Sequence, residues 1–140
     1  MKGTDFILEA LRKEGIGHLF MVPGALIDPF LPALAKVPEI KPVVAAMEAG
    51  AAYMADGYAR ASGNFGVCLA IGGPGVTNMT TAVSAAWTDG SPVLVISGEV
   101  PTAIGGTRRI PGCQRLLFMT TRPSSRPSPT FPWASKTIIC

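Results

Sequence analysis

The segment Val67-Cys-Leu-Ala-Ile-Gly-Gly-Pro-Gly-Val-Thr-Asn78 decides the fold of this chain. Its first part, residues 67–71, is a fully apolar run of strand length, which is typical of a strand buried on both faces of a parallel sheet. The glycine-rich residues 72–75 predict a tight turn, and residues 77–88 predict a helix. The segment is therefore a strand–turn–helix unit, the repeating element of an α/β sheet.

Strand-like and helix-like segments alternate along the first hundred residues. The strand-like segments are short and apolar, whereas the helix-like segments carry apolar or small residues at helical spacing. This alternation predicts an α/β fold with a doubly wound, mostly parallel sheet that is flanked by helices and incomplete on its C-terminal side. The predicted strands are 18–22, 40–45, 67–71 and 93–97, and the predicted helices are 4–15, 28–37, 47–61 and 77–88.

Several helix ends have signals of their own. Thr4 is expected to cap the first helix and Gly15 to end it. Asp28 is expected to cap the second helix, with Pro29 in its first turn. Glu48 stands at the start of the third predicted helix, where the helix dipole favours a carboxylate.

Composition is that of a globular domain with a buried sheet. The 140 residues are 48% apolar and 15% charged, which excludes a disordered chain. No apolar run reaches the roughly 18 residues that a membrane helix needs, and the first residues do not form a signal-peptide core, so a cytoplasmic protein is expected. Cys68, Cys113 and Cys140 lack the spacing of a zinc site or a disulfide framework, and no metal site is predicted in this chain.

The last forty residues differ in composition from the rest. Residues 101–140 hold six Lys or Arg residues, no acid and six of the 13 prolines. We therefore predict two parts, a domain at 1–101 and a basic, Pro- and Ser-rich tail at 102–140 without regular structure, which would leave an apolar sheet edge open at Val93–Ile96. The tail lacks the aromatic and basic interleaving of nucleic-acid-binding segments, so neither nucleic acid nor membrane is an expected partner.

Two motifs stand at the predicted carboxyl ends of strands, where open α/β sheets bind ligands. From its position alone, Glu48 is either an ordinary glutamate in the first turn of a helix or a group that binds a ligand. The turn Gly72-Gly-Pro-Gly75, followed by Asn78, is either a tight connection or a place where backbone approaches a ligand. It matches neither nucleotide-phosphate motif, GxxxxGK[ST] or GxGxxG.

Taken together, these motifs resemble the pyrimidine-binding domain of thiamine-diphosphate-dependent enzymes, in particular those related to acetolactate synthase and benzoylformate decarboxylase. In that family the catalytic glutamate precedes a helix ending in Gly-Tyr-Ala-Arg, as Glu48 precedes Gly57-Tyr-Ala-Arg60. The resemblance covers residues 1–101. It assigns catalysis to Glu48 and cofactor binding to the following residues: Pro23, Gly24, Glu48, Gly73, Pro74, Gly75 and Asn78.

The resemblance also implies a chemistry. Glu48 would hydrogen-bond to a ring nitrogen of the aminopyrimidine of thiamine diphosphate and so promote loss of the cofactor's C2 proton. The cofactor's diphosphate and its Mg²⁺ would be held by a second domain that has no counterpart here. The complete enzyme would act on a 2-oxo acid as a lyase or carboligase, as a homo-oligomer or by pairing with a diphosphate-binding domain, and this chain alone would be inactive. Many relatives have His before this Glu, where this chain has Met47.

Two other functions remain open from the sequence. The small-residue helices at 47–61 and 77–88 suit a non-catalytic dimerisation or interaction module derived from the same family. A stand-alone nucleotide-binding α/β domain is a third reading, which the missing phosphate motif disfavours. His18 and the methionines Met47, Met54 and Met79 are expected to be structural. The abrupt change after residue 102 suggests a shifted reading frame or divergent splicing.

Overall fold

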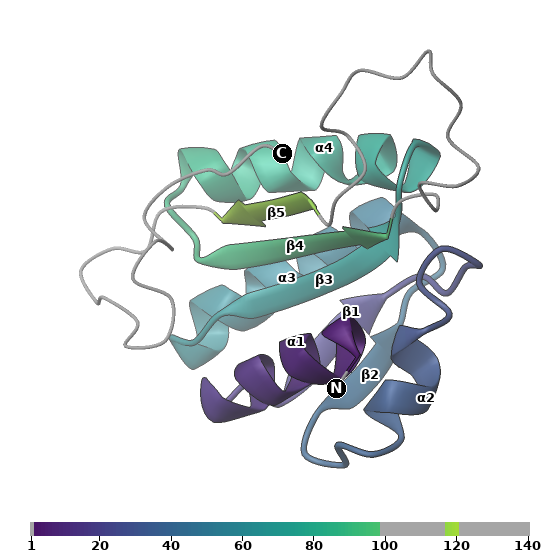
Figure 1. Cartoon of the computed structure of the whole chain (residues 1–140). Helices are drawn as coiled ribbons and strands as arrows, with labels where there is room; N and C mark the ends of the chain where they lie inside the picture. The colour runs from purple at the N-terminus through teal and green to yellow at the C-terminus, as the bar shows by residue number, and fades with distance from the viewer. Residues whose placement is uncertain (1, 99–116, 121–140) are drawn as a thin grey trace.

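The computed structural model describes residues 2–98 and the strand at 117–120 (Figure 1). It has one five-stranded sheet in the order β2-β1-β3-β4-β5, in which the first four strands are parallel and β5 is antiparallel to β4. The strands are β1 (His18–Met21), β2 (Lys41–Val44), β3 (Gly66–Ile71), β4 (Val93–Gly98) and β5 (Leu117–Thr120), and the helices are α1 (Gly3–Lys13), α2 (Phe30–Leu34), α3 (Glu48–Ser62) and α4 (Pro74–Thr88). The predicted α/β fold with a mostly parallel sheet is confirmed.

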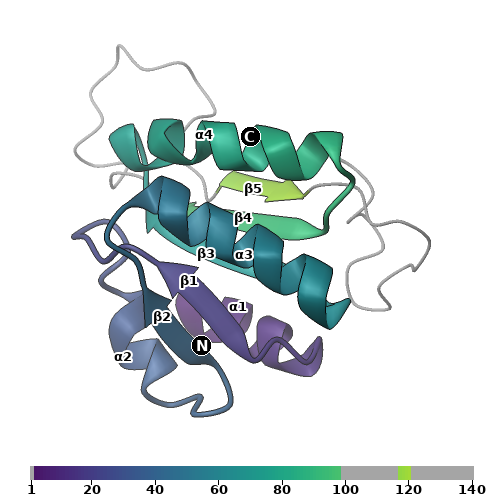
Figure 2. The ribbon, with the colours of Figure 1, turned by 180° about the vertical axis from the view of Figure 1, so that it is seen from behind.

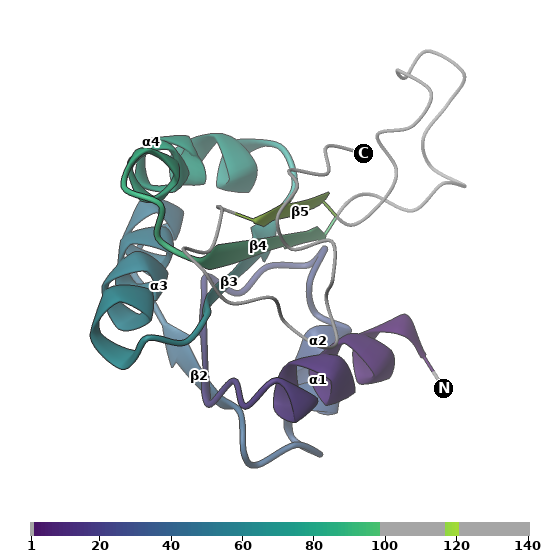
Figure 3. The same cartoon turned by 90° about the vertical axis from the view of Figure 1, so that its left-hand side faces the viewer.

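Helices cover both faces of the sheet. α1 and α2 lie on one face, and α3 and α4 lie side by side on the other (Figures 2 and 3). The chain runs from β1 outward to β2 and then crosses back over β1 to β3, so that the direction of winding reverses between β1 and β3. In doubly wound sheets this reversal opens a crevice at the carboxyl ends of the strands, where ligands bind.

Strand alternation divides the core into two layers. Leu69 and Ile96 face α1 and α2 together with large aliphatic side chains from those helices. Cys68, Ala70 and Val95 face the opposite layer, where α3 and α4 contribute mainly alanines. The strand side chains on that face are mostly small or β-branched, with Phe20 of β1 as the large exception.

The closest approach joins α3 to β3. A Cβ atom on Gly66 would overlap the backbone carbonyl oxygen of Ala55. Gly66 is buried at the first position of β3, so glycine is required there by space and not by backbone conformation. This contact fixes the height of α3 above the sheet.

The helix starts correct three sequence predictions. Thr4 does not cap α1, which begins at Gly3 with the carboxylate of Asp5 accepting the backbone N–H of Lys2 at 3.2 Å. Asp28 does not cap α2, whose N-cap is Pro29 without a side-chain hydrogen bond, because successive turns through residues 24–30 already lead into the helix. α4 begins at Pro74, three residues before the predicted start, since proline is well suited to a first helical position. The predicted end of the first helix at Gly15 agrees with its left-handed φ of 74° directly after the cap residue Glu14.

The strand β5 corrects a fourth prediction. Leu117–Thr120 lies inside the segment expected to lack regular structure, and it pairs with β4 from Leu94 to Ser97. The edge of β4 that the sequence predicted to be open is therefore covered. The rest of the predicted tail, with Cys113 and Cys140, lies outside the described residues.

Candidate cofactor half-site

Three loops meet at the carboxyl edge of the parallel strands. Pro23 and Gly24 follow β1, Glu48 follows β2, and the turn at 72–75 follows β3. Because β1, β2 and β3 are neighbours in the sheet, every predicted site residue lies on this edge, at the reversal of winding. The fold thus gathers segments that are up to fifty residues apart in the sequence.

Glu48 is the first residue of α3. Met47 before it is extended, with φ −153° and ψ 148°, so the chain turns directly from the loop after β2 into the helix. The Glu48 side chain is half-buried, and its Oε2 accepts a hydrogen bond from Asn78 Nδ2 at 2.9 Å. Among the described residues no second side chain hydrogen-bonds to this carboxylate, so Oε1 keeps its lone pairs for another donor.

The glycine turn brings backbone close to this carboxylate. A Cβ atom on Gly75 would lie 3.6 Å from Glu48 Oε1 and 3.0 Å from Ile71 Cγ1. Gly75 is buried, and because it lacks a side chain the backbone of the turn can lie close to both Ile71 and Oε1.

Gly73 and Pro74 shape the same turn. Gly73 is the N-cap of α4 and has a φ of 66°, which favours glycine, and Pro74 follows as the first helical residue. Both residues are exposed. The turn is held to the next strand by a hydrogen bond of 2.6 Å from the backbone N–H of Gly72 to the carbonyl oxygen of Gly98.

Ile71 is a site residue that the sequence reasoning missed. Its side chain lies against both glycine loops, because a Cβ on Gly24 would come within 2.7 Å of Ile71 Cγ2. It therefore forms the floor between the loop after β1 and the turn after β3. The available signal was its position as the last apolar residue of a strand, directly before the glycine turn predicted to bind a ligand.

The donors and acceptors at this edge suit a flat heterocycle with one hydrogen-bond donor better than a metal or a phosphate. The predicted site contains one carboxylate, one amide and apolar or glycine surface, with no cationic side chain. Across residues 2–98, no cluster of three or more His, Cys, Asp or Glu residues is arranged to hold a metal ion. A ring bearing one N–H or protonated nitrogen would satisfy Glu48 Oε1, so the residues fit the aminopyrimidine of thiamine diphosphate.

Other candidate residues lie away from this site. His18 begins β1 at the opposite edge of the sheet, where its ring lies 5.2 Å from that of Tyr58. Met79 is buried in the core, and Met54 is exposed on α3. Burial raises the pKa of the Cys68 thiol to about 12, so this side chain is a neutral core group at physiological pH. In the part of the chain that the structure describes, no helix is both long and apolar enough to cross a membrane; the cytoplasmic location stays a prediction.

Comparison with known proteins decides the family. Residues 1–115 match the family described as thiamine pyrophosphate enzyme, N-terminal TPP binding domain. The chain belongs to this family. The match continues past the predicted boundary at residue 101, which itself stays a prediction.

The relatives of this TPP binding domain include acetolactate synthases and a glyoxylate carboligase. A probable acetolactate synthase large subunit from Methanocaldococcus jannaschii is 42% identical over 106 residues, which cover 76% of this chain and 18% of that protein. A glyoxylate carboligase from Escherichia coli O157:H7 is 45% identical over 104 residues, covering 74% and 18%. The chloroplastic acetolactate synthase 1 of Oryza sativa subsp. japonica is 42% identical over 106 residues, covering 76% and 16%. The chain thus spans less than a fifth of the length of these relatives.

Proposed function

We propose that this chain provides the aminopyrimidine half of a thiamine diphosphate site in a 2-oxo-acid lyase or carboligase of the acetolactate synthase type. The observation that carries the proposal is the arrangement of Glu48, Asn78 and Gly75. One oxygen of the carboxylate is held by an amide, and the other lies beside the backbone of the glycine turn, at the edge where open α/β sheets bind ligands. The fold that carries this edge is a TPP binding domain.

Glu48 is the catalytic residue in this proposal. Thiamine diphosphate supplies, when bound, a carbon nucleophile for attack on the carbonyl group of a 2-oxo acid. Glu48 Oε1 would hold a proton at the pyrimidine ring nitrogen and would so make the exocyclic nitrogen available as a base. Asn78 orients the carboxylate by donating to Oε2, so that Oε1 and not Oε2 is left toward the glycine turn.

The other site residues bind the pyrimidine ring and exclude water from it. Gly73, Pro74 and Gly75 offer a turn without bulky side chains against which a flat ring can lie, and Pro23 and Gly24 line the same edge from the loop after β1. Ile71 gives this edge an apolar floor. Removing water from around a carboxylate strengthens its hydrogen bond to a ring nitrogen.

A second domain completes the site in this proposal. The predicted site residues include no cation and a single carboxylate, so the diphosphate and its Mg²⁺ require ligands from elsewhere. A partner that contributes them, within a homo-oligomer or as a separate diphosphate-binding domain, is consistent with a chain that spans 18% of its carboligase relatives. Alone, the chain is expected to be inactive.

Replacing Glu48 by Gln tests the proposal. The variant is made in a chimera in which residues 1–98 replace the matching segment of a full-length acetolactate synthase. Gln keeps the size and the contact to Asn78 but loses the carboxylate, so exchange of the C2 proton of bound thiamine diphosphate is expected to slow about 100-fold or more. Exchange is measured by quenched-flow proton NMR.

The matched control is Glu39→Gln, a change at an exposed carboxylate remote from the site, which should leave exchange unchanged. Equal exchange rates in Glu48→Gln and the parent chimera would remove Glu48 from this role.

An interaction module is the second candidate function. It is favoured by large apolar side chains that stand exposed on the outer helix layer, with exposed fractions of 48% for Tyr53 and 53% for Trp87. Such side chains on neighbouring helices suit a protein partner. Under this alternative, hybrid oligomers form when the chain is mixed with a full-length relative, and Glu48→Gln has no effect on any proton exchange.

A further inference from the structure

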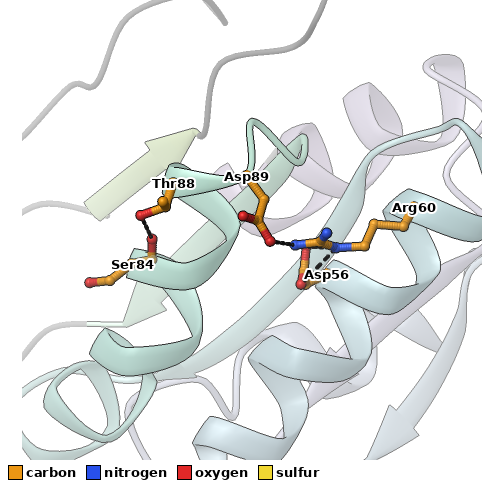
Figure 4. Close-up of polar contacts among 5 residues, drawn as sticks. All are labelled: Asp56, Arg60, Ser84, Thr88 and Asp89. Atoms are coloured by element: carbon orange, nitrogen blue, oxygen red, sulfur yellow. Dashed lines mark hydrogen bonds and ion pairs between the residues drawn. The ribbon is translucent and has the colours of Figure 1, made fainter.

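Arg60 joins the last turns of α3 and α4. Its Nε lies 3.0 Å from both carboxylate oxygens of Asp56, one turn earlier on α3, and its Nη2 lies 2.7 Å from Oδ2 of Asp89, the C-cap residue of α4 (Figure 4). One guanidinium thus binds a carboxylate on its own helix and another on the neighbouring helix. Arginine suits this role because its planar fork presents several donors in fixed directions.

The same two helices are joined at their other ends by the candidate site. Glu48 is the first residue of α3 and Asn78 lies in the second turn of α4, and the two side chains are hydrogen-bonded. Twelve residues separate Glu48 from Arg60, which corresponds to about 18 Å along a helix. The two helices are therefore parallel neighbours with one polar link at each end.

The surface between these links does little to fix the register of the helices. The buried residues that α3 contributes to the shared core layer are all alanines, whereas α4 contributes Ala82 and Ala86 together with Met79 and Val83. Methyl groups give shallow ridges, so the alanine face of α3 constrains the position of α4 along it less than larger side chains would. α3 is seated on the sheet through the close contact of Ala55 with Gly66, and α4 approaches Ile71 and Glu48 through Gly75, where a Cβ would lie 3.0 Å from Ile71 Cγ1. The directional contacts between the helices are the polar ones.

We propose that Asp56, Arg60 and Asp89 form a positioning cluster that sets α4 relative to α3 and thereby holds Asn78 against Glu48. The cluster acts through Asn78 and touches no reacting atom. The effect of this cluster on catalysis rests on the proposed function of Glu48. Its effect on the position of Asn78 does not.

Electrostatics of the cluster agree with this geometry. Burial by itself raises the pKa of Asp56, but hydrogen bonds from Arg60 and Ser91 and the charge of Arg60 outweigh it, and the pKa lies below its ordinary value. Hydrogen bonds to both carboxylates raise the pKa of Arg60 above its ordinary value. Asp56 and Arg60 therefore stay charged at physiological pH. Arg60 and Asp89 are about half exposed, with side-chain exposures of 45% and 53%. Their ion pair therefore contributes more to the placement of α4 relative to α3 than to the free energy of unfolding.

The side-chain amide of Asn78 reports on the proposal in the intact chain. Its NH2 resonances are assigned in a ¹⁵N–¹H NMR spectrum from their loss in Asn78→Asp. Glu48→Gln first establishes the direct effect of changing the acceptor. We expect Asp89→Asn and Arg60→Met to shift the Asn78 resonances and to accelerate exchange of its amide protons at least about threefold. Arg60→Lys should fall between these variants and the parent, because one ammonium group cannot bridge both carboxylates in the same way. The matched control is Arg12→Met, which removes a similarly exposed arginine that pairs with Glu9 on α1 and should leave Asn78 unchanged.

Each outcome separates this inference from the proposed function. If Glu48→Gln shifts Asn78 but Asp89→Asn and Arg60→Met do not, the positioning cluster is wrong and the half-site stands. If the Asp89 variant lowers the urea midpoint without moving Asn78, the cluster is only a stabilising contact and the inference is likewise overturned. If Glu48→Gln leaves Asn78 unmoved, the contact between them is absent in solution, and both proposals lose their basis. Asp89→Asn replaces a single oxygen of an exposed side chain at the end of α4, so this variant is expected to fold. The Asn78 resonances can therefore be measured in it even if Arg60→Met does not fold.

Discussion

Among the described residues, Asp56 is the one charged residue that is buried, with an exposed fraction of 7%. A buried carboxylate is costly unless it is hydrogen-bonded and paired. Here the guanidinium of Arg60 and the hydroxyl of Ser91 more than offset the effect of burial, which otherwise raises the pKa, and the pKa of Asp56 is lowered. The ionised carboxylate is thus a stabilising part of the folded state.

The lowered pKa predicts how stability depends on pH. Because the folded-state pKa lies below the unfolded one, the contribution of Asp56 is complete above the unfolded value near 3.8 and is lost as pH falls through the folded value. Asp56→Asn is expected to lower the free energy of unfolding by about 1–2 kcal/mol at pH 6. The difference between the parent and this variant should shrink between pH 4 and pH 2. Urea unfolding followed by circular dichroism measures it. Asp28→Asn is the control, since Asp28 is exposed and forms no ion pair with any described residue; a difference that stays constant down to pH 2 would contradict the prediction.

Sequence reasoning found the separate site residues but not the contacts between them. The ends of the predicted strands drew attention to Glu48 and the glycine turn, because strand ends of a parallel sheet meet at one edge. The family resemblance then assigned cofactor binding to these residues and to Asn78. The hydrogen bond from Asn78 to Glu48 depends on how two helices lie beside each other. The link from Arg60 to Asp89 likewise spans 29 residues, and no local pattern encodes it. These contacts could not be predicted because the residues that form them lie far apart in the sequence.

At the scale of elements, the seating of α3 on β3 depends on Gly66. A methyl group there would meet the backbone of Ala55, which cannot move aside as a flexible side chain does. Gly66→Ala is therefore expected to lower the free energy of unfolding by about 2 kcal/mol or more. The matched control is Gly57→Ala in the middle of α3, where a Cβ meets nothing within 4 Å. Removing a helical glycine there should raise stability by about 0.5–1 kcal/mol. Thermal unfolding of both variants tests the pair, and equal melting temperatures for them would show that α3 is not held at this contact.

The boundaries of the elements show where local signals compete. Pro74 extends α4 toward the N-terminus because proline fits the first helical turn, although the glycines around it were assigned to the preceding turn. Asp28 has the residue type of a cap, but the turns after β1 give the first backbone groups of α2 other partners. β5 was missed because the four residues Leu117–Thr120 form a short apolar run inside sequence rich in proline and serine. Its pairing with β4 is a tertiary contact, and strand propensity alone was too weak to reveal it.

At the scale of the whole molecule, the two edges of the sheet are protected differently. β2 forms one edge and contains Lys41 and Pro42, residues that discourage pairing with another chain. β4 is apolar and buried throughout, and in the structure β5 occupies its free side from Leu94 to Ser97. Without β5, the backbone N–H and C=O groups along that side of β4 would lack their strand partners.

Truncation on either side of β5 tests its role as an edge strand. A chain that ends at residue 98 loses β5, whereas a chain that ends at residue 120 keeps it, and both keep the same β2 edge and the same α3 and α4 surfaces. The shorter chain is expected to self-associate because unpaired backbone groups on an apolar strand are a template for further strands. Sedimentation velocity at matched concentrations should therefore give a larger weight-average mass for 1–98 than for 1–120, with 1–120 resembling the full chain. Since any association through the helices is common to all three proteins, equal masses for 1–98 and 1–120 would mean that β5 does not protect this edge in solution.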